Sequence, residues 1–214
     1  MTKRMITKIL LPMLAASCAA SIAVAGVEVQ KADITDGKYL FQTSFQDTGK
    51  TRISTTGGIL SQAEPAPALT HVNGTAESWV QTKPDVTFAE LIIKFDFGKT
   101  GAKPASLVFE TAIGVHEGHA SLKSYYKLGD TGEWTPIPSA DQDRFDGWPA
   151  LNSGFTTFPV SQLNDIVYYK VTIEKEPKAK IRWGLEGKEG GAKAPDDSAL
   201  LTKGHGFAMQ FKLK

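Results

Sequence analysis

Apolar and polar side chains alternate along several stretches of the chain. From Leu91 to Phe97 the odd-numbered positions are apolar, whereas Lys94 and Asp96 lie between them. Because successive side chains of a strand point to opposite faces, this pattern predicts a strand with one buried face. The same period of two returns in residues 107–115, 167–173 and 207–213. After residue 25 no stretch keeps apolar residues at helical spacing for three turns, so we expect short helices at most.

Shorter candidate strands lie near residues 39–45, 78–81, 122–128, 133–137 and 180–185, which gives about nine strands in all. Strands with one polar face, separated by turns that contain Gly and Pro, favour an antiparallel arrangement over a parallel sheet. We therefore predict an all-β, antiparallel two-sheet β-sandwich of the jelly-roll type. Residues 63–68 and 186–204 read as loops within one domain that spans residues 26–214. Trp79, Trp134 and Trp183 fall in or beside strands and are predicted core residues.

Four of these stretches resemble a known family. They are Leu91–Phe97, Ala105–Phe109, Ser124–Trp134 and Asp165–Val171, and together they are similar to the central strands of galactose-binding-like (discoidin-type) jelly rolls. The resemblance implies an eight- or nine-stranded jelly roll that binds glycans or other surface ligands through loops at one end. It does not extend to those loops, so it identifies no binding residue.

The first 25 residues have the layout of a secretory signal peptide. Lys3, Arg4 and Lys8 precede an uncharged apolar run that ends in Ala23-Val24-Ala25, the small-residue pattern that a signal peptidase accepts. We expect cleavage after Ala25 and a periplasmic or extracellular protein. A stable transmembrane anchor is not expected, because the apolar run is shorter than the ~20 residues that span a bilayer.

The chain contains a single cysteine, Cys18, within this segment. The preceding residues Leu14 to Ser17 resemble a bacterial lipobox, but the large aliphatic residue lies one position too early. Lipid anchoring through Cys18 is therefore an alternative to cleavage after Ala25. With that cleavage the remaining chain has no cysteine, so its stability must come from a packed core.

The charge balance argues against a nucleic-acid partner. The full chain carries a net charge of +1, and removal of Lys3, Arg4 and Lys8 takes it to −2. Nucleic-acid-binding proteins concentrate Lys and Arg on one face, whereas the lysines here are interspersed with acidic residues.

The segment from Ser139 to Phe158 is predicted to be a loop that is rich in candidate binding residues. Asp141, Asp143 and Asp146 are closely spaced and precede Gly147, which resembles a calcium loop. Calcium takes six to eight oxygen ligands, so clustered carboxylates at a tight turn suit it. The spacing departs from that of an EF-hand, and a plain solvated acidic loop is the alternative. Apart from this candidate calcium ion, we expect no cofactor.

Aromatic residues in the same segment suggest a ligand site. Sugar rings stack on Trp and other aromatic faces, while carboxylates and amides bond their hydroxyls. Trp148 and Phe155, with Asp146 and Asn152, would supply that chemistry. The alternative is that Trp148 folds back and caps the sandwich.

No motif identifies a catalytic centre. Asp-Thr-Gly occurs at residues 47–49 and 130–132, but the flanking residues differ from those of aspartic proteases, and Asp and Gly favour turns. His116 and His119 are three apart, rather than the four that a helical zinc motif needs, and we expect them on a hairpin turn between two strands.

We therefore expect an exported, non-catalytic binding or structural module with a carbohydrate or cell-surface ligand. Two alternatives remain. A jelly-roll hydrolase acting on polysaccharide would need two carboxylates close together in a cleft, and Asp141, Asp143, Glu174 and Glu176 are the available acids. An envelope or assembly subunit would pair with its partner through an exposed edge strand.

Overall fold

The structure is a computed structural model, and the residues that it describes are 27–43, 60–61, 69–73, 78–82, 87–183, 199–201 and 207–214. Thirteen strands are present in these ranges. They are β1 (Val27–Glu28), β2 (Ile34–Thr35), β3 (Lys38–Thr43), β4 (Leu60–Ser61), β5 (Leu69–Asn73), β6 (Ser78–Thr82), β7 (Phe88–Asp96), β8 (Pro104–Leu128), β9 (Thr135–Pro136), β10 (Gln142–Thr157), β11 (Ile166–Lys175), β12 (Lys180–Trp183) and β13 (Phe207–Leu213). The helices are single 3-10 turns, η1 (Lys31–Asp33), η2 (Pro138–Ala140) and η3 (Val160–Gln162). Within the described part of the chain, no helix has the length and apolar character needed to cross a membrane.

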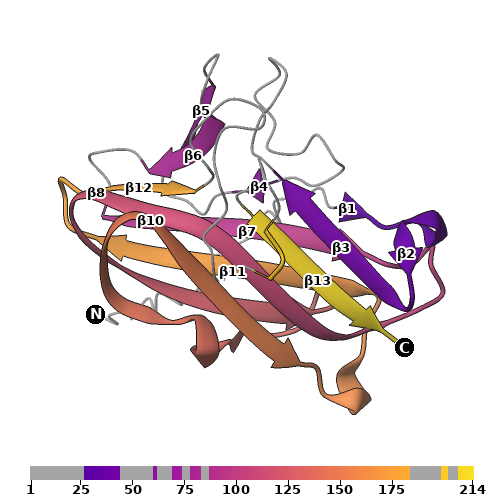
Figure 1. Ribbon diagram of the computed structural model, residues 1–214. Coiled ribbons are helices and arrows are strands. Elements are labelled where there is room, and N and C mark those ends of the chain that lie inside the picture. Colours follow the sequence, from indigo (N-terminus) through magenta and orange to yellow (C-terminus); the bar gives the residue numbers. More distant parts are fainter. Residues whose placement is uncertain are drawn as a thin grey trace, which may run out of the picture.

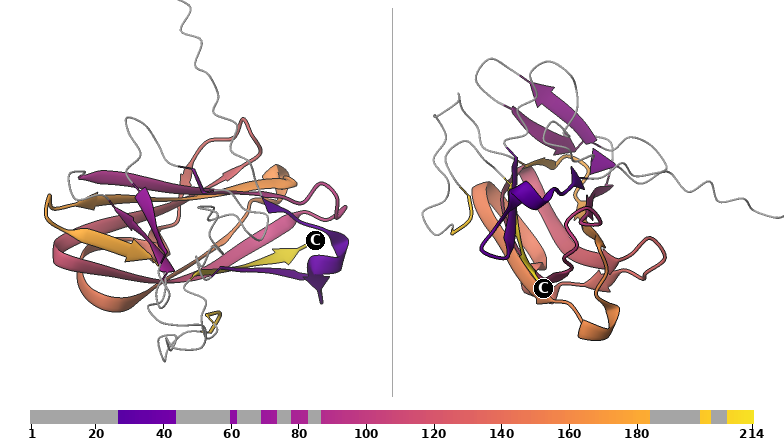
Figure 2. Two further views of the ribbon diagram at one scale, coloured as in Figure 1. Left: turned by 90° about the horizontal axis from the view of Figure 1, so that it is seen from above. Right: turned by 90° about the vertical axis from the view of Figure 1, so that its right-hand side faces the viewer.

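The strands form two packed layers, which lie side by side in the right-hand view of Figure 2. Sheet I consists of β7, β11 and residues 120–128 of β8, with β1 and β4 beside β7 and β9 beside β8. Sheet II consists of β2, β3, β13, residues 104–116 of β8, and β10, and β12, β6 and β5 extend it. Most pairs are antiparallel, so the predicted all-β sandwich is confirmed. The additional strands beyond the predicted set are β10 and several short ones.

The strand β8 passes from one layer to the other, as Figure 1 shows. Its first half pairs with β13, its second half pairs with β11, and β10 pairs with residues of both halves. The predicted hairpin turn at His116–His119 is therefore wrong, since the strand continues through it. Glu117 and Gly118 have φ values of 63° and 125° and bend the strand at this point.

The predicted loop at residues 139–158 is also wrong in its structure. Residues 142–157 form β10, which follows β8 along most of its length. Three register shifts between Gln142 and Ala150 allow β10 to bend with β8 across the side of the sandwich. The candidate residues Asp143, Asp146, Trp148, Asn152 and Phe155 therefore lie on a strand rather than in a loop, and Asp141 directly precedes that strand.

The core lies between the layers and follows the predicted alternation. On β11, Val167, Tyr169, Val171 and Ile173 are buried. The core also contains Ile93 and Phe95 of β7, the odd-numbered residues 105–115 and the even-numbered residues 120–126 of β8, and Phe207, Met209 and Phe211 of β13. Aromatic rings join the layers on the side away from β10. The ring of Phe95 on β7 lies 5.3 Å from Phe41 and 4.8 Å from Phe211, both in sheet II.

The predicted signal peptide at residues 1–25 lies outside the described residues, and so does Cys18. The same holds for the predicted loop at residues 63–68 and for most of residues 186–204.

Candidate functional site

The outer face of sheet I carries aromatic and basic side chains in cross-strand rows. Tyr168 of β11 lies opposite Lys94 of β7 on one side and Lys127 of β8 on the other. In the next row, Lys170 lies opposite Tyr125 of β8. The residues between them along each strand point into the core, so these side chains share the solvent side of the sheet.

A tight turn adds a third aromatic ring to this face. After β8 ends, the chain turns back through residues 129–132, and the Gly129 N–H donates to the Ile166 carbonyl at 2.8 Å. A Cβ at Gly132 would lie 2.2 Å from the Leu128 carbonyl oxygen, so the turn requires glycine there. The following β9 pairs with β8 and holds Trp134 beside Tyr168, with the ring centroids 6.2 Å apart at 76°.

We call this surface the aromatic–lysine face. Its residues are Tyr125, Lys127, Trp134, Tyr168 and Lys170, with Lys94 and Asp130 at its margin.

Lysine ammonium groups lie over the aromatic rings of the face. Lys127 Nζ lies 4.1 Å from the centroid of Tyr168 and 5.4 Å from that of Trp134. Lys170 Nζ lies 4.4 Å from the centroid of Trp134 and 5.0 Å from that of Tyr125. These are cation–π distances, at which a ring face attracts a positive charge. The lysines and rings therefore form one contact network.

Asp130 connects this network at its margin. Its carboxylate accepts hydrogen bonds from the Tyr168 hydroxyl and, at 3.0 Å, from Lys94 Nζ. These two hydrogen bonds hold the pKa of Asp130 below its usual range. Burial raises the pKa of Tyr168, and its hydrogen bond to Asp130 adds to that shift. Burial opposes the charge on Lys94, but the hydrogen bonds to Asp130 and Tyr168 outweigh it, so the pKa of Lys94 is raised.

The remaining lysines differ in their partners. Lys170 Nζ forms an ion pair with Glu90 at 3.3 Å, and both side chains are largely buried. Lys127 Nζ instead donates to the backbone carbonyl of Asp130 at 3.1 Å. Burial lowers the pKa of Lys127, and the charges of Lys94 and Lys170 lower it further against the opposing effect of Asp130. Lys127 thus lies close to two other positive charges, those of Lys94 and Lys170.

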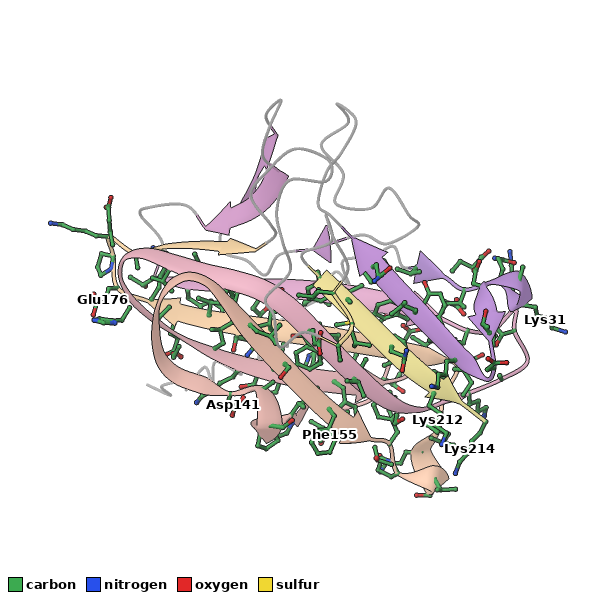
Figure 3. The ribbon with its side chains drawn as sticks, in the orientation of Figure 1. Lys31, Asp141, Phe155, Glu176, Lys212 and Lys214 are labelled. Atoms are coloured by element: carbon green, nitrogen blue, oxygen red, sulfur yellow. The ribbon has the colours of Figure 1, made fainter. Side chains whose placement is uncertain are left out.

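The structure separates the ligand residues that were predicted on β10. Phe155 is 67% exposed on the outer face of sheet II, as Figure 3 shows. Asn152 is 1% exposed, and its Nδ2 donates to the Ala140 carbonyl at 2.9 Å. The two residues therefore lie on opposite faces of β10 and do not form one site. The side chains of Asp146 and Trp148 lie outside the described residues.

The predicted calcium site stays a prediction. Asp141 follows η2 and is exposed, and its Oδ1 accepts a hydrogen bond from the Ser124 N–H at 3.4 Å. The side chains of Asp143 and Asp146 are not described. In the part of the chain that the structure describes, no three His, Cys, Asp or Glu side chains are grouped so that they could hold a metal.

The aromatic–lysine face was missed in the sequence. Trp134 was predicted to be a core residue, but it is half-buried on the outer face. Trp79 and Trp183 do lie in strands, β6 and β12, while their side chains are not described. The alternation along β11 could have revealed part of this face. Its inward residues were predicted correctly, and Tyr168 and Lys170 occupy the outward positions between them.

A pocket of about 400 Å³ lies beside the turn and β9 that carry Trp134. Its lining residues are Tyr126, Leu128, Gly132, Glu133, Thr135 and Gln162. Glu133 is the only carboxylate among them.

No protein-family model matches the chain. No curated protein matches it in sequence.

Solved structures resemble the chain at low identity. The xylan-binding domain CBM22-1 of Paenibacillus barcinonensis Xyn10C is 11% identical, with a TM-score of 0.48 over 84% of this chain and 98% of that one. TmCBM61, solved in complex with β-1,4-galactotriose, is 10% identical, with a TM-score of 0.45 over 63% and 87%. The enzymatically active domain of a bacteriophage CBA120 tailspike protein is 10% identical, with a TM-score of 0.40 over 66% and 21%.

Carbohydrate-binding modules are thus among the structures that this chain resembles.

Proposed function

We propose that the protein is a non-catalytic carbohydrate-binding module and that its glycan lies across the aromatic–lysine face. The observation that carries the proposal is the grouping of Tyr125, Trp134 and Tyr168 with lysine donors and a carboxylate on the solvent side of one sheet. Export by the N-terminal segment, which the sequence predicts, would bring the module to extracellular or cell-envelope glycans.

The chemistry of the face suits a saccharide. Sugar rings present apolar C–H faces that pack on aromatic rings, and their hydroxyls need donors and acceptors at the edge. Trp134 is half-buried and gives ring surface, and the 57% exposed side chain of Asp130 gives acceptor atoms. The lysine ammonium groups supply donors. The face also lies on paired strands, which hold the rings in fixed positions.

A polysaccharide hydrolase is a weaker interpretation of the same surface. Glycoside hydrolysis generally needs a pair of carboxyl groups flanking the scissile bond. The pocket beside the face has one carboxylate, Glu133. Glu174 and Glu176 lie at and beyond the end of β11, away from this pocket.

Pairing with a partner through an edge strand is also disfavoured at β10. The Ser139 hydroxyl accepts a hydrogen bond from the Phe155 N–H and donates to the Phe155 carbonyl, both at 3.2 Å. These are the backbone groups that an added strand would need. Ser139 therefore caps this part of the edge.

A substitution at Trp134 tests the proposal directly. We expect Trp134→Ala to weaken binding by tenfold or more to any polysaccharide that the unmodified protein binds. The reason is that an anchoring aromatic residue contributes about 2 kcal/mol to the binding free energy. Affinity electrophoresis against a polysaccharide panel, followed by calorimetry, measures the loss.

Phe155→Ala is the matched control, because Phe155 is an exposed aromatic residue on the opposite layer. It should leave binding unchanged. Loss of binding in the Phe155 variant with full binding in the Trp134 variant would move the site to sheet II. If the protein binds none of the polysaccharides in the panel, the proposed function is wrong.

A further inference from the structure

The rings of the aromatic–lysine face are covered by positive charge. Lys127 and Lys170 both lie over Trp134, and each also covers a tyrosine. A neutral sugar that stacks on the ring faces that these ammonium groups occupy must displace them and give up their cation–π contacts. An acidic sugar can instead pair with the ammonium groups where they stand, through charge-assisted hydrogen bonds that are about twice as strong as neutral ones.

We propose that the ligand of this face is an acidic polysaccharide whose anionic groups pair with Lys127 and Lys170. The inference rests on the proposed glycan-binding function and specifies the class of glycan.

Lys127 is the centre of the proposed anion site. Lys94 is paired with Asp130, and Lys170 is paired with Glu90. Among the described residues, Lys127 has no carboxylate within ion-pair distance, and its ammonium group donates to a backbone carbonyl. An ammonium group has three donors, so Lys127 retains donors for a ligand oxygen. An anion placed here would also offset the repulsion from Lys94 and Lys170.

The spacing of the two lysines suits a chain of acidic sugars. Lys127 Nζ and Lys170 Nζ lie 5.4 and 4.4 Å from the same Trp134 centroid. Both ammonium groups therefore lie within reach of one polysaccharide that contacts Trp134. Trp134 is half-buried, so part of its ring remains available to the sugar.

The test uses pairs of polymers that differ in charge alone. Polygalacturonate is compared with its carboxyl-reduced form, and dextran sulfate with dextran, by affinity electrophoresis and calorimetry on the full protein. We expect the protein to bind the charged member of a pair at least tenfold more tightly than the neutral member. If polygalacturonate slows the migration of the protein, the face recognises carboxylates. If only dextran sulfate slows it, the face recognises sulfates.

A lysine variant shows whether this face is responsible. Lys127→Gln should weaken binding of the charged polymer about tenfold, equivalent to about 1.4 kcal/mol, because it removes the positive charge that pairs with the anionic group. Lys212→Gln is the matched control, because Lys212 is an exposed lysine on β13 of sheet II (Figure 3). It should change binding less than twofold. Unfolding curves of both variants establish that each is folded.

The outcomes separate this inference from the proposed function. Equal binding of the charged and neutral forms, lost in Trp134→Ala, would overturn the acidic ligand and keep the glycan-binding face. Equal loss in Lys127→Gln and Lys212→Gln would show general charge attraction and would also overturn it. Absence of binding to every polymer would overturn both.

Discussion

Glu110 shows how a single buried carboxylate organises a loop. It lies on the outer face of sheet II but is only 6% exposed, because residues 199–201 cover it. Its oxygens accept hydrogen bonds from the N–H groups of Ala199, Leu200 and Leu201, at 2.7–3.3 Å. The loop is thus attached to β8 by backbone contacts with one side chain.

We predict that Glu110→Ala lowers the free energy of unfolding by about 2 kcal/mol, since buried N–H groups lose their acceptor. Chemical denaturation measures the change. The control is Glu174→Ala, which removes an exposed carboxylate of β11 and should cost at most about 0.5 kcal/mol. Equal losses in the two variants would contradict the anchoring role.

At the same scale, the sequence identified inward residues better than outward ones. Phe95 and Tyr169 are buried as predicted, because burial of one face follows from the alternation itself. Trp134 was predicted wrongly, because a large apolar ring is usually buried. Its place on the surface depends on the turn at Gly132 and on the lysines of neighbouring strands, and local sequence does not show which strands are neighbours.

At the scale of elements, the bend in β8 allows one strand to serve both sheets. Gly118 has φ of 125°, and a Cβ there would lie 2.8 Å from Glu176 Oε2 and 3.3 Å from the Ala179 Cβ. We predict that Gly118→Ala destabilises the protein by about 2 kcal/mol, because the backbone is strained for any other residue and the site is crowded.

Gly101→Ala is the matched control for that variant. Gly101 also has a positive φ, 74°, but a Cβ there meets nothing within 4 Å. Its substitution should cost only about 1 kcal/mol of backbone strain. Thermal unfolding of both variants measures the difference, and a Gly118 variant no less stable than the Gly101 variant would contradict a crowded bend.

The strand β10 could not be predicted from its own sequence. Its sequence contains Gly147, Pro149 and Gly154, which are typical of loops. The strand exists because it pairs with β8, and glycine is required where it passes the core. A Cβ at Gly154 would lie 2.6 Å from the Ala140 Cβ and 2.7 Å from the Phe109 ring. Such long-range pairing overrides the local preference.

At the scale of the whole molecule, the two layers have different outer faces. Sheet I presents the aromatic–lysine face, whereas sheet II presents a row in which Leu40, Val108 and Phe155 are exposed at 44%, 40% and 67%. The predicted binding site was placed on β10, which belongs to sheet II. The two-sheet sandwich was predictable from periodicity, but the choice between its faces depends on contacts made across strands.

Nuclear magnetic resonance can show which sheet the glycan contacts. The protein is labelled with ¹⁵N and titrated with an oligosaccharide derived from a polymer that it binds, and amide and indole chemical shifts are followed. If the glycan binds on sheet I, the largest changes occur at Tyr125, Lys127, Tyr168 and Lys170 and at the Trp134 indole. Changes confined to the surface around Val108 and Phe155 would place the glycan on sheet II instead.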